Sequence, residues 1–307
     1  MPSVDVVIVN WNSGEQLADC VASLLAHDAG DIAAIMVVDN ASQDGSADLD
    51  FADERLTIIK SSENLGFGKA CNMGASYGTA PLILLVNPDC CVRPNSIRGA
   101  AEFLLSDTER AYVACGIRLT DAAGQTQRHC ARQPRPAMFL AESTGVSRIA
   151  PRPFPPVIMT DFDHLSDRDV DHVIGAFYCV RRAAFDHVGG FNPKFFMYME
   201  DLDLSARLRA GNMKIRYLAA PSAFHAGGGT SRQILGRRLG YAMEGRARFS
   251  ALHFGRGAHL LVLLAMLTAE PLARIGQALA SGRAGAIGEV AEGYRVFLQR
   301  YFARDAP

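Results

Sequence analysis

The chain of 307 residues is predicted to form an α/β fold: a mixed, mostly parallel sheet flanked by helices, with a helical appendage at the C-terminus. Over the first hundred residues, short runs that are apolar throughout alternate with helical segments, as in parallel strands covered on both faces. The residues that follow each run are polar, as expected where strand ends form a ligand-binding rim. From about residue 232 the pattern is helical, which predicts the appendage.

The elements are expected in the following order. The first strands are 4–9, 33–38, 56–60 and 82–86, with helices over 14–26, 68–77 and 95–105. A hairpin over 111–128 turns at 121–124, and the proline- and arginine-rich segment 134–156 is expected to be a loop or lid with one turn of helix. A strand over 170–181, a helix over 183–188, a helix that ends at Gly211 and a strand over 214–218 precede the tail. The expected domains are 1–231 and 232–307.

Composition is that of a globular protein, with 49% hydrophobic and 21% charged residues. The seven cysteines show neither a CxxC pair nor zinc-site spacing, so we expect reduced thiols. The first residues lack the basic and apolar pattern of a secretory signal, and a cytoplasmic protein is therefore expected.

Charge is divided unevenly along the chain. Residues 232–307 hold eleven arginines, no lysine and five acids, a charge of +6, which leaves −7 for the rest. The same region carries the apolar run LLVLLAML at 260–267, far shorter than the roughly 20 residues that span a bilayer. An anionic membrane surface fits this pattern better than nucleic acid does. We expect either an interfacial amphipathic helix or a helix packed against the body.

Four strand ends carry the polar motifs. They are NWN at 10–12, DNASQDG at 39–45, SSENLGFG at 61–68 and NPD at 87–89. Each motif alone is compatible with an ordinary turn. Four together at one rim favour a crevice of nucleotide size. The glycines at 66 and 68 match neither a dinucleotide fingerprint nor a P-loop.

Asp89 is the candidate metal ligand, because Mg²⁺ and Mn²⁺ take few protein carboxylates and complete their coordination with phosphates and water. A Pro-Asp turn is the alternative. His225, beside a glycine-rich turn, is a second candidate for metal or phosphate.

The stretch FFMYMEDLDLSARLRAG, residues 195–211, places acids directly after an apolar and aromatic segment. A helix start explains the acids in part, with Asp203 paired to Arg207 one turn later. Apolar surroundings also raise the proton affinity of a carboxylate, which is one way to tune a general base.

Five motifs in this order resemble the bacterial family 2 inverting glycosyltransferases of the GT-A (Rossmann-like) fold, and are most similar to the rhamnosyltransferase-like branch. They are VVIVNWNSGEQLADCVASL, VVDNASQDGS, NLGFGKACNMGA, LLVNPD and GAFYCVRRAAFDHVGGFNPKFFMYMEDLDLSARLRAG, followed by His225. The resemblance covers about residues 4–231.

The resemblance implies a role for each matching position. Asn10 and Asn12 would lie under the nucleotide, and Asp39 would accept hydrogen bonds from its pyrimidine base. The residues implied to line the donor near its ribose and sugar are Asn64, Gly66, Gly68 and Asn72. Asp201 would be the catalytic base, and Glu200 would hydrogen-bond the acceptor.

The same resemblance places the motif Asn87-Pro88-Asp89 where the family has its metal-binding DxD. Asp89 would be the acid on the metal side, and His225 a ligand of the metal or the diphosphate. Asn87 departs from the family pattern, because the first acid of DxD is missing; it is expected to face the donor.

The implied activity is metal-dependent transfer of a hexose with inversion. The expected cofactors are Mg²⁺ or Mn²⁺ and a dTDP- or UDP-linked sugar, with L-rhamnose first. The acceptor would be a saccharide or a polyprenyl-diphosphate-linked sugar in cell-surface polysaccharide or O-antigen synthesis, at the inner membrane face. A UDP-hexose transferase of the same family, a non-catalytic nucleotide-sugar-binding protein and a sugar nucleotidyltransferase stay open. The last would need a basic loop after the first strand, and residues 10–15 hold no Lys or Arg.

Overall fold

The computed structural model describes residues 3–228, 234–283 and 285–303. The chain divides into two compact units. The first, the sheet unit, comprises residues 1–132, 160–193 and 201–230; the second, the helical unit, comprises 133–159, 194–200 and 231–307. The expected domain boundary after 231 falls at one crossing between them, within residues 229–233, which lie outside the described part of the chain.

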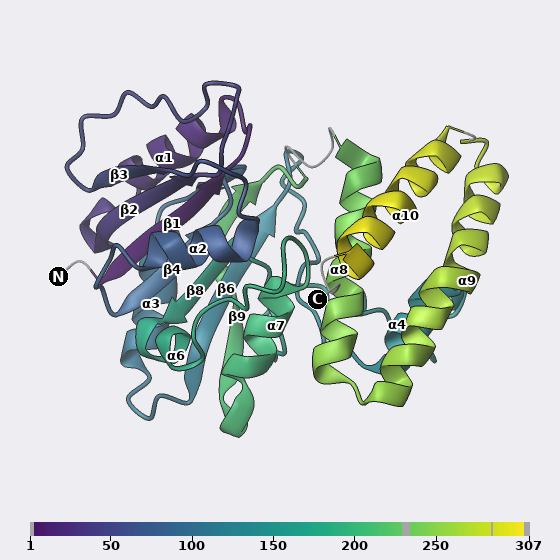
Figure 1. Cartoon of the computed structure of the whole chain (residues 1–307). Helices are drawn as coiled ribbons and strands as arrows, with labels where there is room; N and C mark the ends of the chain where they lie inside the picture. The colour runs from purple at the N-terminus through teal and green to yellow at the C-terminus, as the bar shows by residue number, and fades with distance from the viewer. Residues whose placement is uncertain (1–2, 229–233, 284, 304–307) are drawn as a thin grey trace. The chain divides into compact units, whose positions relative to one another are not determined.

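The sheet of the first unit has the strand order β3-β2-β1-β4-β8-β6-β9-β5, with β7 also paired to β9 (Figure 1). The first four strands in this order, β3 (Leu56–Lys60), β2 (Ile32–Asp39), β1 (Val4–Asn10) and β4 (Leu82–Val86), are parallel. β8 (Phe177–Arg181) is antiparallel to β4 and to β6 (Tyr112–Thr120). β9 (Lys214–His225) is parallel to β6, and it pairs antiparallel with β5 (Cys90–Val92) and β7 (Arg168–Val170). The predicted mixed, mostly parallel sheet is confirmed.

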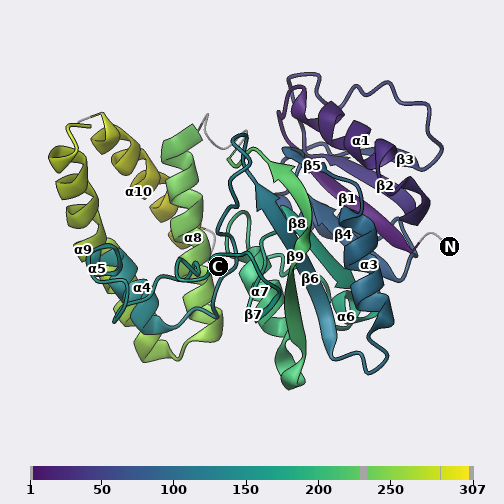
Figure 2. The same ribbon diagram turned by 180° about the vertical axis from the view of Figure 1, so that it is seen from behind.

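Helices cover both faces of this sheet. α1 (Gln16–Ala26) and α3 (Ser96–Ser106) lie on the face seen in Figure 2. α2 (Phe67–Ala75), α6 (Arg182–His187) and α7 (Glu200–Leu208) lie on the face seen in Figure 1. Short 3₁₀ turns, η1 (Ala29–Asp31) and η2 (Ala210–Asn212), follow α1 and α7.

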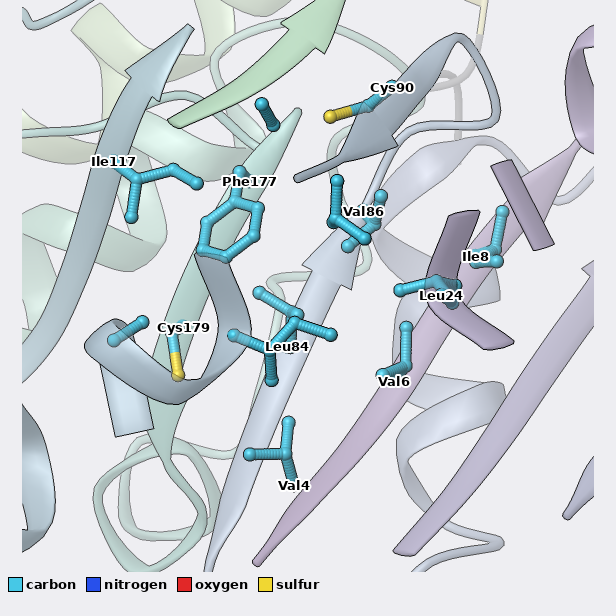
Figure 3. Packing of buried hydrophobic residues seen from close by; sticks show 14 of the residues in the cluster. Val4, Val6, Ile8, Leu24, Leu84, Val86, Cys90, Ile117, Phe177 and Cys179 are labelled. Atoms are coloured by element: carbon cyan, nitrogen blue, oxygen red, sulfur yellow. The ribbon is translucent and has the colours of Figure 1, made fainter. Parts of the chain in front are cut away.

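The central strands are buried throughout because both faces are covered. Val4, Val6 and Ile8 of β1 point into a cluster with Leu24 of α1 and Leu84 of β4 (Figure 3). The opposite face of β1 packs on α2 so closely that a Cβ on Gly74 would lie 2.5 Å from Val7. Apolar runs without alternation therefore predicted these strands correctly.

Three sequence predictions in the second half of the sheet differ from the structure. Strand β9 does not end at residue 218, because a register shift opposite Ile117 and Arg118 accommodates residues 219–221 and pairing resumes at Ser222. A proline is tolerated at such an irregularity, which explains Pro221. The expected strand 170–181 is two strands, with an intervening loop at 171–176. The second arm of the hairpin over 111–128 forms only the bridge of Thr120 to Thr126.

The helical unit contains α4 (Pro136–Ser143), α5 (Val146–Ile149), α8 (Leu235–His253), α9 (Arg256–Ala280) and α10 (Ala286–Ala303). The expected loop or lid over 134–156 is therefore wrong. Pro136 stands in the first turn of α4, where its missing N–H costs nothing. Phe139 of the same helix is buried against Phe249 and Phe254, with ring centroids 6.0 and 5.5 Å away.

Buried ion pairs hold the helical unit together. Glu270 of α9 accepts hydrogen bonds from Arg246 of α8 at 2.6 Å, from Arg274 at 2.7 Å and from Ser143 of α4 at 3.0 Å. Burial alone would raise the pKa of Glu270, but the two guanidinium groups lower it below its usual range. Glu244 is bound in the same way by Arg248 and Arg300.

Helix α9 presents its leucines outward. The residues of α9 that are buried include Val262, Met266 and Glu270, whereas Leu260, Leu261 and Leu264 are 61%, 58% and 58% exposed. The apolar run 260–267 lies in the first half of α9, a helix of 25 residues, so the expectation of an apolar segment far too short to span a bilayer was wrong. By length and composition alone α9 could cross a membrane, a test that core helices also pass.

Candidate active site

The first part of the site lies where β1 and β2 end. Asn10 and Asp39 are register partners, and the Asn10 Nδ2 donates to Asp39 Oδ1 over 3.0 Å. Asn10 is fully buried and also donates to Ser42 and Ser46, so it fixes the loop after β2. Asn12 has a φ of 49° and its side-chain oxygen accepts the Gln43 N–H over 2.7 Å. The two strand-end loops are thus tied to each other by amide side chains.

Asn40 links this loop to the one after β3. Its Nδ2 donates to Asn64 Oδ1 over 3.0 Å, and its Oδ1 accepts the Leu65 N–H over 2.8 Å. Asn64 Oδ1 also accepts the Gly66 N–H over 2.9 Å. Gly66 has φ 81° and ψ 174°, a backbone conformation that is essentially restricted to glycine. Sequence reasoning selected Asn64 and Gly66 but missed Asn40, although it directly follows Asp39.

Gly68 and Asn72 of α2 pack against the segment around Phe191. A Cβ on Gly68 would lie 2.9 Å from the Phe191 Cβ. The Asn72 amide donates to the Phe191 carbonyl over 2.9 Å and accepts the Phe191 N–H over 2.8 Å. Both polar ends of this side chain are thus occupied by backbone. The structure gives these two residues a packing role, and contact with a donor stays a prediction.

Asp89 and His225 are brought together by strand pairing. Cys90 of β5 is the register partner of His225 on β9, and the Ala226 N–H donates to the Asp89 carbonyl over 3.0 Å. The His225 Nε2 lies 3.5 Å from Asp89 Oδ1, and each side chain is 8% exposed. Asn87, at the end of β4, is partly exposed. The three predicted residues therefore lie at one end of the sheet.

Gln127 fixes the tautomer of His225. Its Nε2 donates to the His225 backbone carbonyl over 2.7 Å, which leaves its Oε1 2.9 Å from His225 Nδ1. An amide oxygen only accepts, so Nδ1 carries the proton in this contact. In the neutral ring the lone pair of Nε2 then faces the Asp89 carboxylate, as ligand atoms face a shared cation.

These atoms fit a divalent cation, with Asp89 and His225 as the residues that would hold it. A carboxylate oxygen and an imidazole nitrogen suit Mn²⁺, and the oxygen suits Mg²⁺. Within the part of the chain that the structure describes, no group of three or more His, Cys, Asp or Glu side chains gathers as a metal site. The remaining ligands would be phosphate oxygens and water.

Asp201 is the second residue of α7 and is held by three donors. Its Oδ1 accepts the N–H of the next residue, Leu202, over 2.9 Å. Oδ2 accepts the Gly175 N–H over 3.3 Å and lies 3.5 Å from His172 Nε2. The side chain is 21% exposed, so a ligand can reach it. Gly175 matters here, because a Cβ would press on the Phe67 ring at 3.1 Å beside the carboxylate.

The predicted direction of tuning at Asp201 was wrong. Burial by itself raises the pKa of this carboxyl, as expected from an apolar wall. The adjacent His172 and the N–H groups of Gly175 and Leu202 favour the charged form more strongly, so the pKa of Asp201 lies below its usual range. The proton affinity of the Asp201 carboxyl is therefore lowered and not raised.

The aromatic residues that precede Asp201 belong to the helical unit. Phe195 is buried, and the Phe196 ring lies 5.0 Å from the Tyr241 ring and 4.1 Å from the Arg300 guanidinium. Tyr198 and Met199 both have a φ of 68°, a strained conformation for residues with large side chains. Glu200 is buried and belongs to the same unit. Its expected contact with an acceptor stays a prediction.

Comparison with known proteins identifies the family of the chain. The family model described as glycosyl transferase family 2 matches residues 5–189. The N-acetylglucosaminyl-diphospho-decaprenol L-rhamnosyltransferase of Mycobacterium tuberculosis (strain ATCC 25618 / H37Rv) is 30% identical over 243 residues, 74% of this chain and 77% of the relative.

Two solved structures share the fold. The mannosyltransferase PcManGT from Pyrobaculum calidifontis, in complex with GDP-Man and Mn²⁺, has a TM-score of 0.53 at 18% sequence identity. The match covers 100% of this chain and 81% of the PcManGT chain. GalNAc-T7 with UDP, GalNAc and Mn²⁺ has a TM-score of 0.52 at 15% sequence identity. The match covers 73% of this chain and 43% of the GalNAc-T7 chain.

The fold is therefore that of the GT-A glycosyltransferases. The chain belongs to glycosyl transferase family 2, and it is a rhamnosyltransferase-like member of that family.

Proposed function

We propose that the chain transfers a sugar, L-rhamnose first, from a pyrimidine nucleoside-diphosphate donor to a hydroxyl of a saccharide or lipid-linked acceptor, with inversion. One observation carries the proposal: the partly exposed Asp201 accepts the Gly175 N–H just before β8, where the adjacent Ala176 carbonyl accepts the Asn87 N–H of the segment that leads to the Asp89 and His225 pair. The similarity to the N-acetylglucosaminyl-diphospho-decaprenol L-rhamnosyltransferase of M. tuberculosis supports L-rhamnose as the sugar and an N-acetylglucosaminyl diphosphate lipid as the acceptor.

In this reaction Asp201 takes the proton of the acceptor hydroxyl. The hydroxyl oxygen forms a bond to the anomeric carbon as the bond from that carbon to the diphosphate breaks, and the electron pair leaves with the nucleoside diphosphate. Attack on the face opposite the leaving group inverts the anomeric centre. Asp89 and His225 would hold a divalent cation, which would supply positive charge near the leaving diphosphate. Asn10, Asn12 and Asp39 would hold the nucleotide.

Nucleotide binding tests the donor half of the proposal. Trp11, the single tryptophan, lies between Asn10 and Asn12, so its emission is a local reporter. With Mg²⁺ or Mn²⁺ present, we expect dTDP and UDP to raise the melting temperature of the protein. With Mg²⁺, the same two nucleotides should also change Trp11 emission. GDP and ADP should have neither effect. A preference for a purine nucleotide, or equal shifts without metal, would contradict the assignment of Asp39 and Asp89.

Gln127 provides a sharper test of the cation site. Gln127→Leu is expected to weaken the cation dependence of dTDP binding by about 10- to 100-fold, because the orientation of a histidine ligand is lost. Gln125→Leu is the matched control, since Gln125 is exposed and two residues away. If dTDP binding depends on cation concentration equally in the two variants, His225 is not a ligand of the cation.

The alternatives are separated by products. Transfer of rhamnose from dTDP-L-rhamnose to a synthetic N-acetylglucosaminyl diphosphate lipid, with release of dTDP, is the expected result. Faster turnover with a UDP-hexose would select the other donor class. Pyrophosphate release from a nucleoside triphosphate and a sugar phosphate would identify a nucleotidyltransferase. Nucleotide binding without turnover of any donor would identify a non-catalytic binding protein.

We also propose that α9 places the enzyme on the inner membrane surface. Its leucines face outward and Glu270 faces inward, the reverse of a helix at a water-exposed surface. Charge contributes less than the sequence suggested, because Arg246, Arg248, Arg274 and Arg300 are bound to Glu244 and Glu270.

Flotation with liposomes tests this placement. The protein is expected to float with vesicles of phosphatidylethanolamine and phosphatidylglycerol at low salt. Replacing Leu260, Leu261 and Leu264 together by Gln should abolish flotation, because apolar contact is lost. Leu165→Gln is the control, since this leucine of the sheet unit is 63% exposed. Protein that remains at the bottom of the gradient would rule out the membrane role.

A further inference from the structure

A chain of buried polar side chains leads from Asp201 into the sheet unit. His172 Nδ1 lies 2.8 Å from Ser205 Oγ, and the Tyr178 hydroxyl lies 3.0 Å from the same Oγ. All three side chains are buried, and His172 Nε2 faces Asp201 Oδ2. Tyr178 stands on β8, Ser205 on α7 and His172 in the loop between β7 and β8. Three separate elements are thus joined behind the candidate base.

The hydrogen bonds in this chain run in one direction. Burial raises the pKa of Tyr178, so its hydroxyl keeps its proton and can donate to Ser205 Oγ. Ser205 then donates to His172 Nδ1, and the remaining ring proton lies on Nε2 and points at Asp201. The reverse direction would leave the Tyr178 proton without an acceptor and would set the lone pair of Nε2 against a carboxylate. Only the first arrangement satisfies every proton.

The backbone around His172 is equally fixed. The Ala131 N–H donates to the His172 carbonyl over 3.0 Å as part of an isolated bridge. The two donors at Oδ2, His172 Nε2 and the Gly175 N–H, come from this one loop. Oδ1 has the N–H of Leu202 as its partner and keeps its other lone pair for a ligand.

We propose that His172, oriented by Ser205 and Tyr178, is the positioning residue for Asp201: it occupies Oδ2 and leaves Oδ1 as the atom that receives the acceptor proton. The inference rests on the proposed function, because it assigns Asp201 the role of base. His172 is not a catalytic residue in this scheme, since it touches neither the donor nor the acceptor. Its contribution is to hold one carboxylate oxygen still while the other reacts.

Three variants test the proposal. His172→Leu removes the donor at Oδ2, His172→Gln keeps an N–H of similar reach, and Tyr178→Phe removes only the far hydroxyl. Turnover is measured with dTDP-L-rhamnose and the N-acetylglucosaminyl diphosphate lipid, and dTDP affinity by Trp11 emission. His172→Leu is expected to lower kcat by about 10- to 100-fold, because the carboxylate is no longer held. Tyr178→Phe should lower it by about 2- to 10-fold, the effect of one hydrogen bond.

Two further results distinguish positioning from mere stability. The dTDP affinity should be unchanged in all three variants, and His172→Gln should recover most of the kcat that His172→Leu loses. The double variant Asp201→Asn/His172→Leu should be no slower than Asp201→Asn alone, because both changes act on one carboxylate.

Opposite outcomes overturn the inference. Wild-type kcat in folded His172→Leu, or a His172→Gln variant as slow as His172→Leu, means that Oδ2 needs no such partner. If His172→Leu does not fold, Tyr178→Phe decides, and an unchanged kcat there rejects the chain. Full turnover in Asp201→Asn would instead overturn the assignment of Asp201 as the base, and no turnover in the unmodified chain would overturn the proposed function. A lowered kcat in Asp201→Asn together with a wild-type kcat in His172→Leu would contradict only the positioning role of His172.

Discussion

Asp201→Asn is expected to lower kcat/KM for rhamnosyl transfer by about 10²- to 10⁴-fold, the range supplied by a general base. The substitution keeps the size of the side chain and its place at the start of α7, but it removes the site that receives the proton. Affinity for dTDP, read from Trp11 emission, should not change. Measured together, the two quantities separate a loss of chemistry from a loss of binding.

Asp203→Asn is the matched control on the same helix. Asp203 is buried and paired with Arg207 over 2.8 Å, so its loss should lower the melting temperature while the folded variant keeps most of its kcat/KM. Equal turnover in Asp201→Asn and the unmodified chain would show that Asp201 is not the catalytic base.

The pH dependence follows from the same geometry. The neighbours of Asp201 hold its pKa below its usual range, so the base stays ionised until the pH falls below about 4, the ordinary value for aspartate. A decline of kcat/KM between pH 8 and 5 is therefore not expected from this residue.

Glu270→Ala is expected to destabilise the helical unit by about 3 to 5 kcal/mol. The change leaves the guanidinium of Arg246, 9% exposed, without its partner in a buried position. Urea unfolding followed by far-UV circular dichroism measures the loss. The double variant Arg246→Met/Glu270→Met should be more stable than Glu270→Ala, because no charge is left unpaired between these two positions. An unchanged unfolding midpoint in Glu270→Ala would show that the network contributes nothing.

The first half of the sheet could be predicted because local pattern and tertiary environment agree there. The expected strands 56–60 and 82–86 have the bounds that the structure gives to β3 and β4. Asn10 and Asp39 end neighbouring parallel strands, so their meeting follows from the strand pattern. Asn64, Asn87 and Asp89 were found by the same reasoning.

The rest depended on contacts between distant segments. The predicted strand ended at residue 218, and only pairing with β6 and β5 shows that it continues to His225. Gln127 and His172 carry no local signal, because each acquires its role from a partner on another element. The apolar stretch before Asp201 suggested a raised proton affinity, and a histidine far away in sequence reverses it. Likewise, the prolines of segment 134–156 suggested a loop, whereas one of them begins α4.

The pairing of β5 with β9 also bears on the order in which the site forms. Asp89 and His225 come from distant parts of the chain, and closing so long a loop is slow compared with forming the neighbouring parallel strands. A chain in which β9 has not yet docked has Asn10 and Asp39 in place but only half of the proposed cation site. On the proposed function, affinity for a nucleotide together with its metal is therefore acquired only when β9 pairs with β5.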